Sequence, residues 1–295
     1  MSPASRFQGF LLLGFTAAAW GLNWPVLKFV LAEFPPFTFR AITGIAGVLL
    51  LLAIALLRGD RIRPPRGQLP WLALSGLLNV TSMMGLATLA LFWLQASEAV
   101  IVAYTMPIWT TLLAWPILGE RPSLRSLAGL AIGFAGVLIL VAGDVFGANA
   151  ATFASKLPGF ALISGTAIMF ALGTIVTKRH PILMPPVPMV AWQISFGMLP
   201  LLIAAVLLEN GDVSRAGPAG WLCLLYIVTI ALCAAYLTWF RALRMLPAAT
   251  AATGMLLVPI IGVLSSALAL GEPIGLRHAV ALAFTVTGVG LASRG

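Results

Sequence analysis

The residues of this 295-residue chain that could do chemistry are polar and aromatic side chains set inside long apolar runs. Trp20, Asn23 and Trp24 come first, with Pro25 directly after them. Trp20 and Trp24 are four residues apart, so on a helix they share one face. They could form an aromatic wall that receives an apolar solute, or they could face lipid at the membrane interface. The depth of Trp24 in its run and its polar neighbours favour the wall, where the chemistry is noncovalent stacking and burial.

A second group lies in the run that contains Asn79, Ser82 and Met83. Asn79 and Ser82 are three residues apart, which places them on one face of an α-helix. The Asn79 amide could hold an ammonium or carboxylate group of a solute, or it could make a hydrogen bond between helices. Met83 offers an adaptable apolar surface, although methionine also serves as core filler.

Further aromatic side chains complete the predicted site. Tyr104 carries a hydroxyl that needs a partner inside a membrane, Phe170 lies one half of the chain after Trp20, and Tyr236 and Trp239 are three residues apart. We therefore predict an apolar, aromatic and weakly charged substrate-binding cavity, lined by Trp20, Asn23, Trp24, Asn79, Ser82, Met83, Tyr104, Phe170, Tyr236 and Trp239.

Charged and nucleophilic residues give little support for an enzyme. Glu98 is a candidate coupling or gating carboxylate, but a solvated position near the membrane surface is favoured because deep charge is costly. Arg40 opens an apolar run and is expected to brace its outer end rather than bind substrate. His180 and His278 fall at opposite membrane faces, so they cannot share a metal ion. We expect no catalytic residue, no metal ion and no cofactor.

The composition requires a bilayer as the solvent. The chain is 61% hydrophobic and only 8% charged, with a mean hydropathy of +1.05, whereas soluble domains carry about 25% charged residues. The net charge of +9 is dispersed in short gaps and forms no patch for nucleic acid. We predict an all-α integral membrane protein with ten spans, at 8–31, 37–57, 69–92, 96–117, 124–143, 157–178, 187–208, 218–241, 248–270 and 275–293. Most Lys and Arg residues fall in gaps that are cytoplasmic if both termini are cytoplasmic.

The sequence contains an internal duplication. Proline followed after eleven residues by Gly-Glu occurs at Pro107 to Glu120 and again at Pro259 to Glu272. Each copy belongs to a set of five spans, and an odd number of spans inverts the second set in the membrane. We expect a first five-helix repeat at 1–143, an outer connecting loop at 144–156, and a second, inverted repeat at 157–295.

Inverted repeats place a substrate site near the midplane, where the halves meet. Residues that bend or loosen a helix near that plane are the candidate hinges or gates, because proline frees a backbone carbonyl and glycine permits close approach. These residues are Gly21, Pro25, Pro107 and Pro259.

The duplication and its motifs resemble the drug/metabolite transporter (DMT) superfamily, in its EamA-type branch. The resemblance covers almost the whole chain and includes Trp20 to Trp24, Pro36 with Arg40, and the two Pro…Gly-Glu endings. Within that branch the chain is most similar to YddG-type aromatic amino acid exporters. The stretch from Phe170 to Thr174 lacks the paired tryptophans and the proline of the first half, so the two halves cannot contribute equally to a site.

The resemblance implies a secondary transporter of the bacterial inner membrane that exports amino acids, with aromatic or bulky apolar side chains favoured. Export of another small metabolite or of a cationic drug is the alternative, and a non-transporting receptor or scaffold is the alternative from a different class. The expected partners are a small-molecule substrate and the lipid bilayer. The glycines at 129, 133 and 136 allow close helix contact, which is a packing signal and could also serve as the face of a homodimer.

Overall fold

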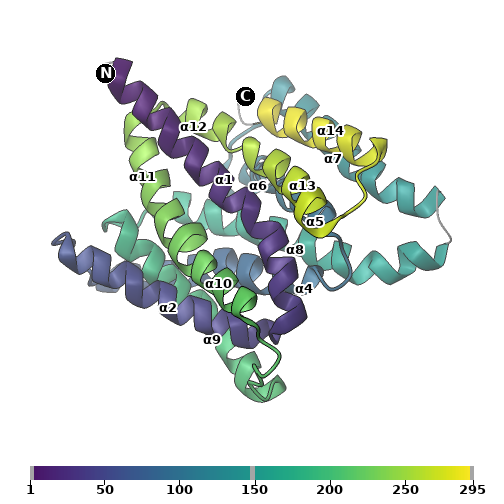
Figure 1. Ribbon diagram of the computed structural model, residues 1–295. Helices are drawn as coiled ribbons and strands as arrows, with labels where there is room; N and C mark the ends of the chain where they lie inside the picture. The colour runs from purple at the N-terminus through teal and green to yellow at the C-terminus, as the bar shows by residue number, and fades with distance from the viewer. Residues whose placement is uncertain (1–2, 147–149, 293–295) are drawn as a thin grey trace.

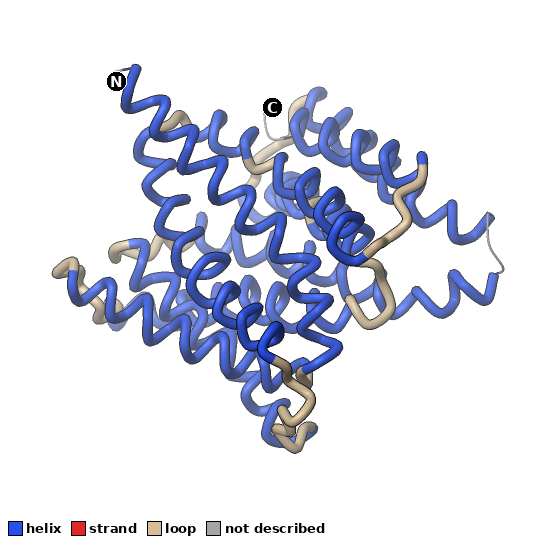
Figure 2. The backbone as a smooth tube through the Cα atoms, in the orientation of Figure 1, coloured by secondary structure: helices blue, strands red, loops and turns tan. Residues whose placement is uncertain are grey.

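The computed structural model describes residues 3–146 and 150–292, and every element within them is a helix. Helices suit a bilayer because they satisfy their backbone hydrogen bonds internally, where no water can do so. Figures 1 and 2 show the helices packed side by side, with short loops between most of them. The prediction of an all-helical membrane protein is confirmed.

All ten predicted spans fold as helical segments. The first half comprises α1 (Pro3–Glu33), α2 (Pro36–Leu57), a third span built of α3 (Leu69–Gly76), η2 (Leu77–Leu86) and α4 (Ala87–Ala90), a fourth built of α5 (Ala96–Ala103) and α6 (Met106–Leu118), and α7 (Leu124–Phe146). The second half comprises α8 (Ala150–Arg179), α9 (Pro186–Leu208), then α10 (Pro218–Tyr226), η3 (Ile227–Ala234) and α11 (Ala235–Met245), then α12 (Ala248–Gly254) and α13 (Leu257–Leu270), and α14 (Leu276–Ala292). A short 3₁₀ turn, η1 (Arg66–Gln68), precedes α3.

Seven of the helical stretches in the described residues are long and apolar enough to cross a membrane unaided. The shorter apolar stretches are Leu124–Leu140, Leu257–Leu270 and Leu276–Ala292. The second of these is extended by α12, from which it is separated only by a brief interruption. The ten spans therefore differ in length but follow the predicted order.

The fourth and ninth spans are interrupted at equivalent places. α5 stops at Ala103 and α6 resumes at Met106, one residue before Pro107. α12 stops at Gly254 and α13 resumes at Leu257, two residues before Pro259. Proline has no N–H to donate to the preceding turn, so a continuous helix is weakest there.

The Gly-Glu motif ends each of these spans. Gly119 follows α6 with a φ of 74°, and Gly271 follows α13 with a φ of 65°. A left-handed C-cap of this kind favours glycine, which has no Cβ to clash. The duplicated glycine is thereby explained as a helix stop.

The third and eighth spans each contain a π-helical segment, η2 and η3, flanked by α-helix on both sides. Their wider hydrogen-bond pattern is visible where Ala87 N–H donates to the Ser82 carbonyl and Ala235 N–H donates to the Ile230 carbonyl, each five residues back. π-helical turns are rare and frequently occur at functional sites. The two segments occupy equivalent positions in the two halves.

Equivalent spans pack against each other in opposite directions, which establishes the inversion of the repeats. Gly129, early in α7, lies against Ala292 at the end of α14, and Gly136 lies against Ala281 near its start. α7 and α14 lie alongside each other in Figure 1. The start of α2 likewise meets Glu209 after the end of α9.

One detail differs from the sequence-based expectations. The predicted outer loop at 144–156 is largely helical, because α7 continues to Phe146 and α8 begins at Ala150. α1 continues through Pro25 without interruption. Gly21 does permit the expected close approach, since a Cβ there would lie 3.1 Å from the Val258 carbonyl oxygen of α13.

Candidate functional site

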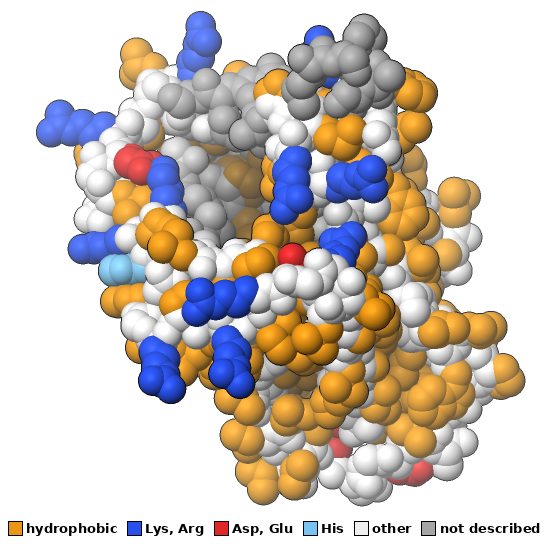
Figure 3. Space-filling model, turned by 90° about the vertical axis from the view of Figure 1, so that its left-hand side faces the viewer, with side chains coloured by type: hydrophobic (Ala, Val, Ile, Leu, Met, Phe, Trp, Pro, Cys, Tyr) orange, Lys and Arg blue, Asp and Glu red, His pale blue; other side chains and the backbone are white. Residues whose placement is uncertain are grey.

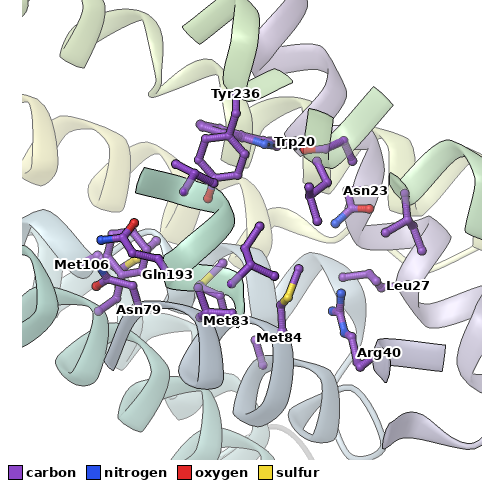
Figure 4. Close-up of a pocket in the computed structure, with 18 of the residues that line it drawn as sticks. Trp20, Asn23, Leu27, Arg40, Asn79, Met83, Met84, Met106, Gln193 and Tyr236 are labelled. Atoms are coloured by element: carbon purple, nitrogen blue, oxygen red, sulfur yellow. Dashed lines mark hydrogen bonds between the residues drawn. The ribbon is translucent and has the colours of Figure 1, made fainter. Parts of the chain in front are cut away.

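A cavity of about 400 Å³ lies between the two halves. This volume falls within the range of pockets that enclose small molecules. Eight of the ten predicted residues line it, and Figure 4 shows the side chains that converge on it. The lining consists of Trp20, Asn23, Trp24, Leu27, Arg40, Asn79, Val80, Met83, Met84, Ala87, Tyr104, Met106, Phe170, Met189, Val190, Gln193, Ile194, Ile227, Ala231, Leu232, Tyr236, Phe240 and Met255.

Aromatic rings from α1 and α11 form one wall. The Trp20 ring meets the Tyr236 ring edge to face, with centroids 5.4 Å apart, and Tyr236 stacks on Phe240 at 6.1 Å. The Trp20 indole N–H donates to the Ala231 carbonyl of η3 at 2.9 Å, which fixes the ring in place. An apolar solute would therefore meet a preformed aromatic surface.

The π-helical segments supply much of the remaining lining. Asn79, Met83 and Met84 come from η2, and Ala231 and Leu232 come from η3. The Asn79 amide packs against Gly173 of α8, where a Cβ would fall only 2.0 Å from its Oδ1 atom. A residue larger than glycine at position 173 would therefore displace the Asn79 side chain.

Polar groups in the cavity have hydrogen-bonding capacity to spare. Within the described residues, Asn23 Oδ1 and Asn79 Oδ1 are buried and have no hydrogen-bond partner. Gln193 from α9 donates to the Ser75 hydroxyl at 3.0 Å. Buried amide oxygens without partners are costly, and a ligand donor would satisfy them.

Arg40 also lines the cavity, contrary to its predicted role as a brace at the outer end of a span. Its side chain is 3% exposed. The Nε and Nη2 atoms both donate to the Thr88 hydroxyl, at 2.8 and 2.6 Å. The guanidinium is therefore the charged group in the lining, since no acidic residue occurs among the lining residues.

Two predicted site residues lie elsewhere. Ser82 is fully buried, and its hydroxyl donates to the Leu78 and Asn79 carbonyls of its own helix. Trp239 packs in a separate cluster with Leu13 and Leu246, although its ring lies 6.1 Å from that of Trp20. Neither side chain is among those that line the cavity.

Glu98 is not solvated near the surface, as the sequence had suggested, but completely buried. Its Oε1 atom forms an ion pair with Lys156 at 2.6 Å and lies 3.9 Å from Arg277. Its Oε2 atom accepts the Gln95 N–H at 3.0 Å, which closes a capping box at the start of α5. Glu98 thus ties together α5, α8 and the start of α14.

Glu272, in the second Gly-Glu motif, caps the same helix from the other half. Its carboxylate accepts Ala96 N–H at 2.7 Å, Ser97 N–H at 3.0 Å and the Ser97 hydroxyl at 2.6 Å. Lys28 of α1 interacts electrostatically with both Glu272 and Glu98 and donates to the Leu94 carbonyl at 2.9 Å. We call Glu98, Glu272, Lys28 and Lys156 the outer cluster.

Two more carboxylates cap helix N-termini on the same predicted outer side. Glu209 accepts the Phe37 and Thr38 N–H groups at 2.8 and 2.6 Å, at the start of α2. Glu33 accepts the Gly217 N–H at 3.0 Å, before α10. A carboxylate at a helix N-terminus is favoured by the helix dipole. The ends of the spans on this side are therefore fastened between the halves.

The first Gly-Glu motif makes weaker contacts on the opposite side. Glu120 pairs with Lys178 at 2.6 Å, but both side chains are about half exposed, at 48% and 60%. Figure 3 shows many Lys and Arg side chains on this face, gathered around a hollow. Surface pairs of this kind contribute little, about 0–1 kcal/mol.

Comparison with known proteins assigns this duplicated, cavity-containing bundle to a family. The model of the EamA-like transporter family matches the chain twice, over residues 8–142 and 157–294. The chain belongs to the EamA-like transporter family. It is a multi-pass membrane transporter and not an enzyme. Within the described residues, no group of three or more His, Cys, Asp or Glu side chains could hold a metal ion.

Relatives extend across almost the whole chain. The uncharacterized transporter YvbV of Bacillus subtilis is 31% identical over 98% of this chain and 92% of its own length. A probable amino-acid metabolite efflux pump of Salmonella typhimurium is 29% identical over 91% and 88%, and the inner membrane transporter YedA of Escherichia coli is 26% identical over 94% and 87%. A crystal structure with 23% identity covers 95% of both chains with a TM-score of 0.66, which supports the fold.

The lining residues that sequence reasoning missed come from several helices, and α9 contributes four of them. Met189, Gln193 and Ile194 line the cavity, yet none was selected beforehand. Gln193 did carry a signal, because it is a polar residue inside an apolar run. Arg40 carried the same kind of signal, but its position near the end of a predicted span favoured a bracing role, and its actual depth depends on how other spans pack around it.

Proposed function

We propose that this transporter exports amino acids, with aromatic or bulky apolar side chains favoured, by alternating access through the cavity between its halves. The observation that carries this proposal is the pairing of an aromatic wall, built on Trp20 and Tyr236, with unpartnered amide oxygens of Asn23 and Asn79. The wall suits the side chain of such a solute and the amides suit its polar head. The description of one relative as a probable amino-acid metabolite efflux pump is consistent with this proposal.

The structure favours an amino acid over a cationic drug. A buried cation needs a compensating negative charge, and no Asp or Glu is among the lining residues. Glu98, the one acidic residue that the sequence offered for this purpose, is engaged by Lys156 outside the cavity. Export of another small metabolite that is not cationic remains the alternative.

The contacts at the two ends support a mechanism for alternating access. We infer that the described state is closed on the outer side, where the outer cluster joins α5 to α13 and α8. The same state is open on the basic side, where Figure 3 shows the hollow. Pro107 and Pro259 lie beside the interruptions of the fourth and ninth spans, which makes them the hinges in this scheme. Gly21 and Pro25 would serve as packing and bending points of α1.

Transport by the purified protein in liposomes tests the proposal. Uptake of labelled tryptophan, phenylalanine and leucine should exceed uptake by protein-free vesicles, and tryptophan and phenylalanine should compete with each other. A Tyr236→Ala variant should weaken the binding of tryptophan and phenylalanine more than the binding of leucine, because it removes part of the aromatic wall. The absence of flux for every amino acid would end the proposal.

A further inference from the structure

We propose that Arg40 binds the carboxylate of the substrate, so that the transported solutes are those that join a carboxylate to an apolar body. This inference deepens the proposed function and rests on it. It assigns a specificity-determining role to a residue that the sequence alone presented as a structural brace.

Within the described residues, no acidic side chain is placed as a counterion for the buried guanidinium of Arg40. The side chain is 3% exposed and faces the cavity, and no acidic side chain of the described residues forms an ion pair with it. Its polar partner is one hydroxyl, Thr88 Oγ1, which receives both the Nε and the Nη2 bonds. The Phe39 ring lies 4.9 Å from Cζ and offers a weak cation–π contact.

Most of the hydrogen-bonding capacity of this guanidinium is therefore uncommitted. Arginine carries five N–H donors in a planar fork, and Thr88 engages only two of them. A buried charge without compensation is unfavourable, and a ligand that supplies the opposite charge would compensate the guanidinium of Arg40. The fork matches the two oxygens of a carboxylate and forms strong, charge-assisted hydrogen bonds with them.

The nearby carboxylates of the protein are not free to play this part. Glu209 is engaged by the first turn of α2, only a few residues before Arg40. Glu98 and Glu272 are engaged by α5 and the lysines of the outer cluster. Arg40 is consequently a charged side chain of the cavity lining without a carboxylate partner from these residues.

Asn23 supplies a complementary acceptor on the same side of the cavity. In Figure 4, Arg40 extends from α2 toward the side where Asn23 and Leu27 of α1 lie. The Asn23 Oδ1 atom is buried without a partner, and it could accept a hydrogen bond from an ammonium group. A solute held by its head at this end would extend its apolar part toward Trp20 and the rings around it.

Four related ligands separate this role from a structural one. Tryptophan carries both head groups, indole-3-propionate only the carboxylate, and tryptamine only the amine, while tryptophan amide keeps the amine and neutralises the carboxylate. Binding to the purified full-length protein in detergent would be measured by thermal stabilisation and by competition with labelled tryptophan. Tryptophan and indole-3-propionate should bind at least tenfold more tightly than tryptamine and tryptophan amide.

Three proteins would be compared: wild type, Arg40→Gln and Thr88→Val. Arg40→Gln should lower the affinity for tryptophan and indole-3-propionate about 10- to 100-fold, because one charge-assisted pair is lost. The affinities for tryptamine and tryptophan amide should stay unchanged. Thr88→Val removes the partner of Arg40 but keeps the charge, so it should preserve the preference for carboxylates. If Arg40 had only a structural role, both variants would lose affinity for all four ligands to the same extent.

The inference is overturned if wild type binds tryptophan and its amide equally, or if Arg40→Gln weakens all four ligands alike. The ligand series on wild type decides the matter even if Arg40→Gln does not fold. Failure of the proposed function is a distinct result: amino acid flux would be absent, while carboxylate-dependent stabilisation would still report on Arg40. If no carboxylate ligand stabilises the protein, the inference fails.

Discussion

Replacing Glu272 with Gln should shift the transporter toward a state that is open on its outer side. Glu272 accepts three hydrogen bonds from the first turn of α5, at 2.6–3.0 Å. Glutamine keeps the shape but loses the charge and one acceptor oxygen. A hydrogen bond to a charged group contributes about 1.5–3 kcal/mol and a neutral one about 0.5–1.5 kcal/mol. Loss of the charge therefore weakens each bond by about 1–1.5 kcal/mol, and a net change equivalent to one or two of the three bonds destabilises the closed outer side by about 1–3 kcal/mol.

That loss translates into a measurable change in population. At about 1.4 kcal/mol for each factor of ten, the ratio of outward-open to outward-closed protein should rise roughly 5- to 150-fold. A cysteine placed in the cavity at Met83, in a background in which the free cysteines Cys223 and Cys233 are replaced, would report this change. Its rate of labelling by a membrane-impermeant maleimide should increase in vesicles that expose the outer face.

Glu120→Gln is the matched control, because Glu120 occupies the equivalent place in the first repeat but forms an exposed pair with Lys178. Its loss should change labelling from either face by less than about fivefold, as expected for a surface ion pair. The reasoning is refuted if Glu272→Gln leaves labelling from the outer face unchanged. It is equally refuted if Glu120→Gln accelerates that labelling more than Glu272→Gln does.

Two further predictions concern packing and the cavity wall. Gly288→Ala should lower the free energy of unfolding in detergent by about 1–3 kcal/mol, because its Cβ would fall 2.4–2.7 Å from backbone atoms of α7. Gly14→Ala is the control and should be near neutral, because a Cβ at Gly14 would meet open space. Equal melting temperatures of the two variants would contradict this prediction. Trp20→Ala should raise the KM for tryptophan about 5- to 100-fold, because the substrate loses contacts with the cavity wall. Trp239→Ala should change the KM less than twofold, because Trp239 does not line the cavity. Similar KM values for both variants would show that tryptophan does not bind in this cavity.

Much of the fold could be predicted from the sequence because its signals are local. The two Pro…Gly-Glu copies specify an interruption near Pro107 and Pro259 and left-handed helix stops at Gly119 and Gly271. Both effects follow from the covalent structure of proline and glycine. The inversion also followed from counting spans, and antiparallel packing of equivalent helices confirmed it.

The site was predicted less completely because it depends on helix geometry and packing. Asn79 and Ser82 were expected on one face, three residues apart on an α-helix, but they lie in the π-helical segment η2. A π-helix turns through a smaller angle per residue, so residues three apart diverge and residues four apart converge. Asn79 and Met83 accordingly line the cavity together, and Ser82 points elsewhere.

Charged residues were the hardest to place from sequence. Glu98 and Arg40 lie near the ends of spans, where solvation is the simplest expectation. Both are buried, because residues distant in sequence, Lys156 for Glu98 and Thr88 for Arg40, provide their polar contacts. Partners of this kind cannot be identified from a single chain before its packing is known.

The π-helical turns also bear on how lengths vary between family members. A π-helical turn holds more residues than an α-helical one, so deleting a single residue from η2 would let the span return to uniform α-helix. Every side chain between the deletion and α4 would then rotate by about 100° about the helix axis. In sequence alignments, a one-residue gap at Leu77–Leu86 or Ile227–Ala234 would consequently indicate a differently shaped chamber for the solute, even though the fold and its topology were unchanged.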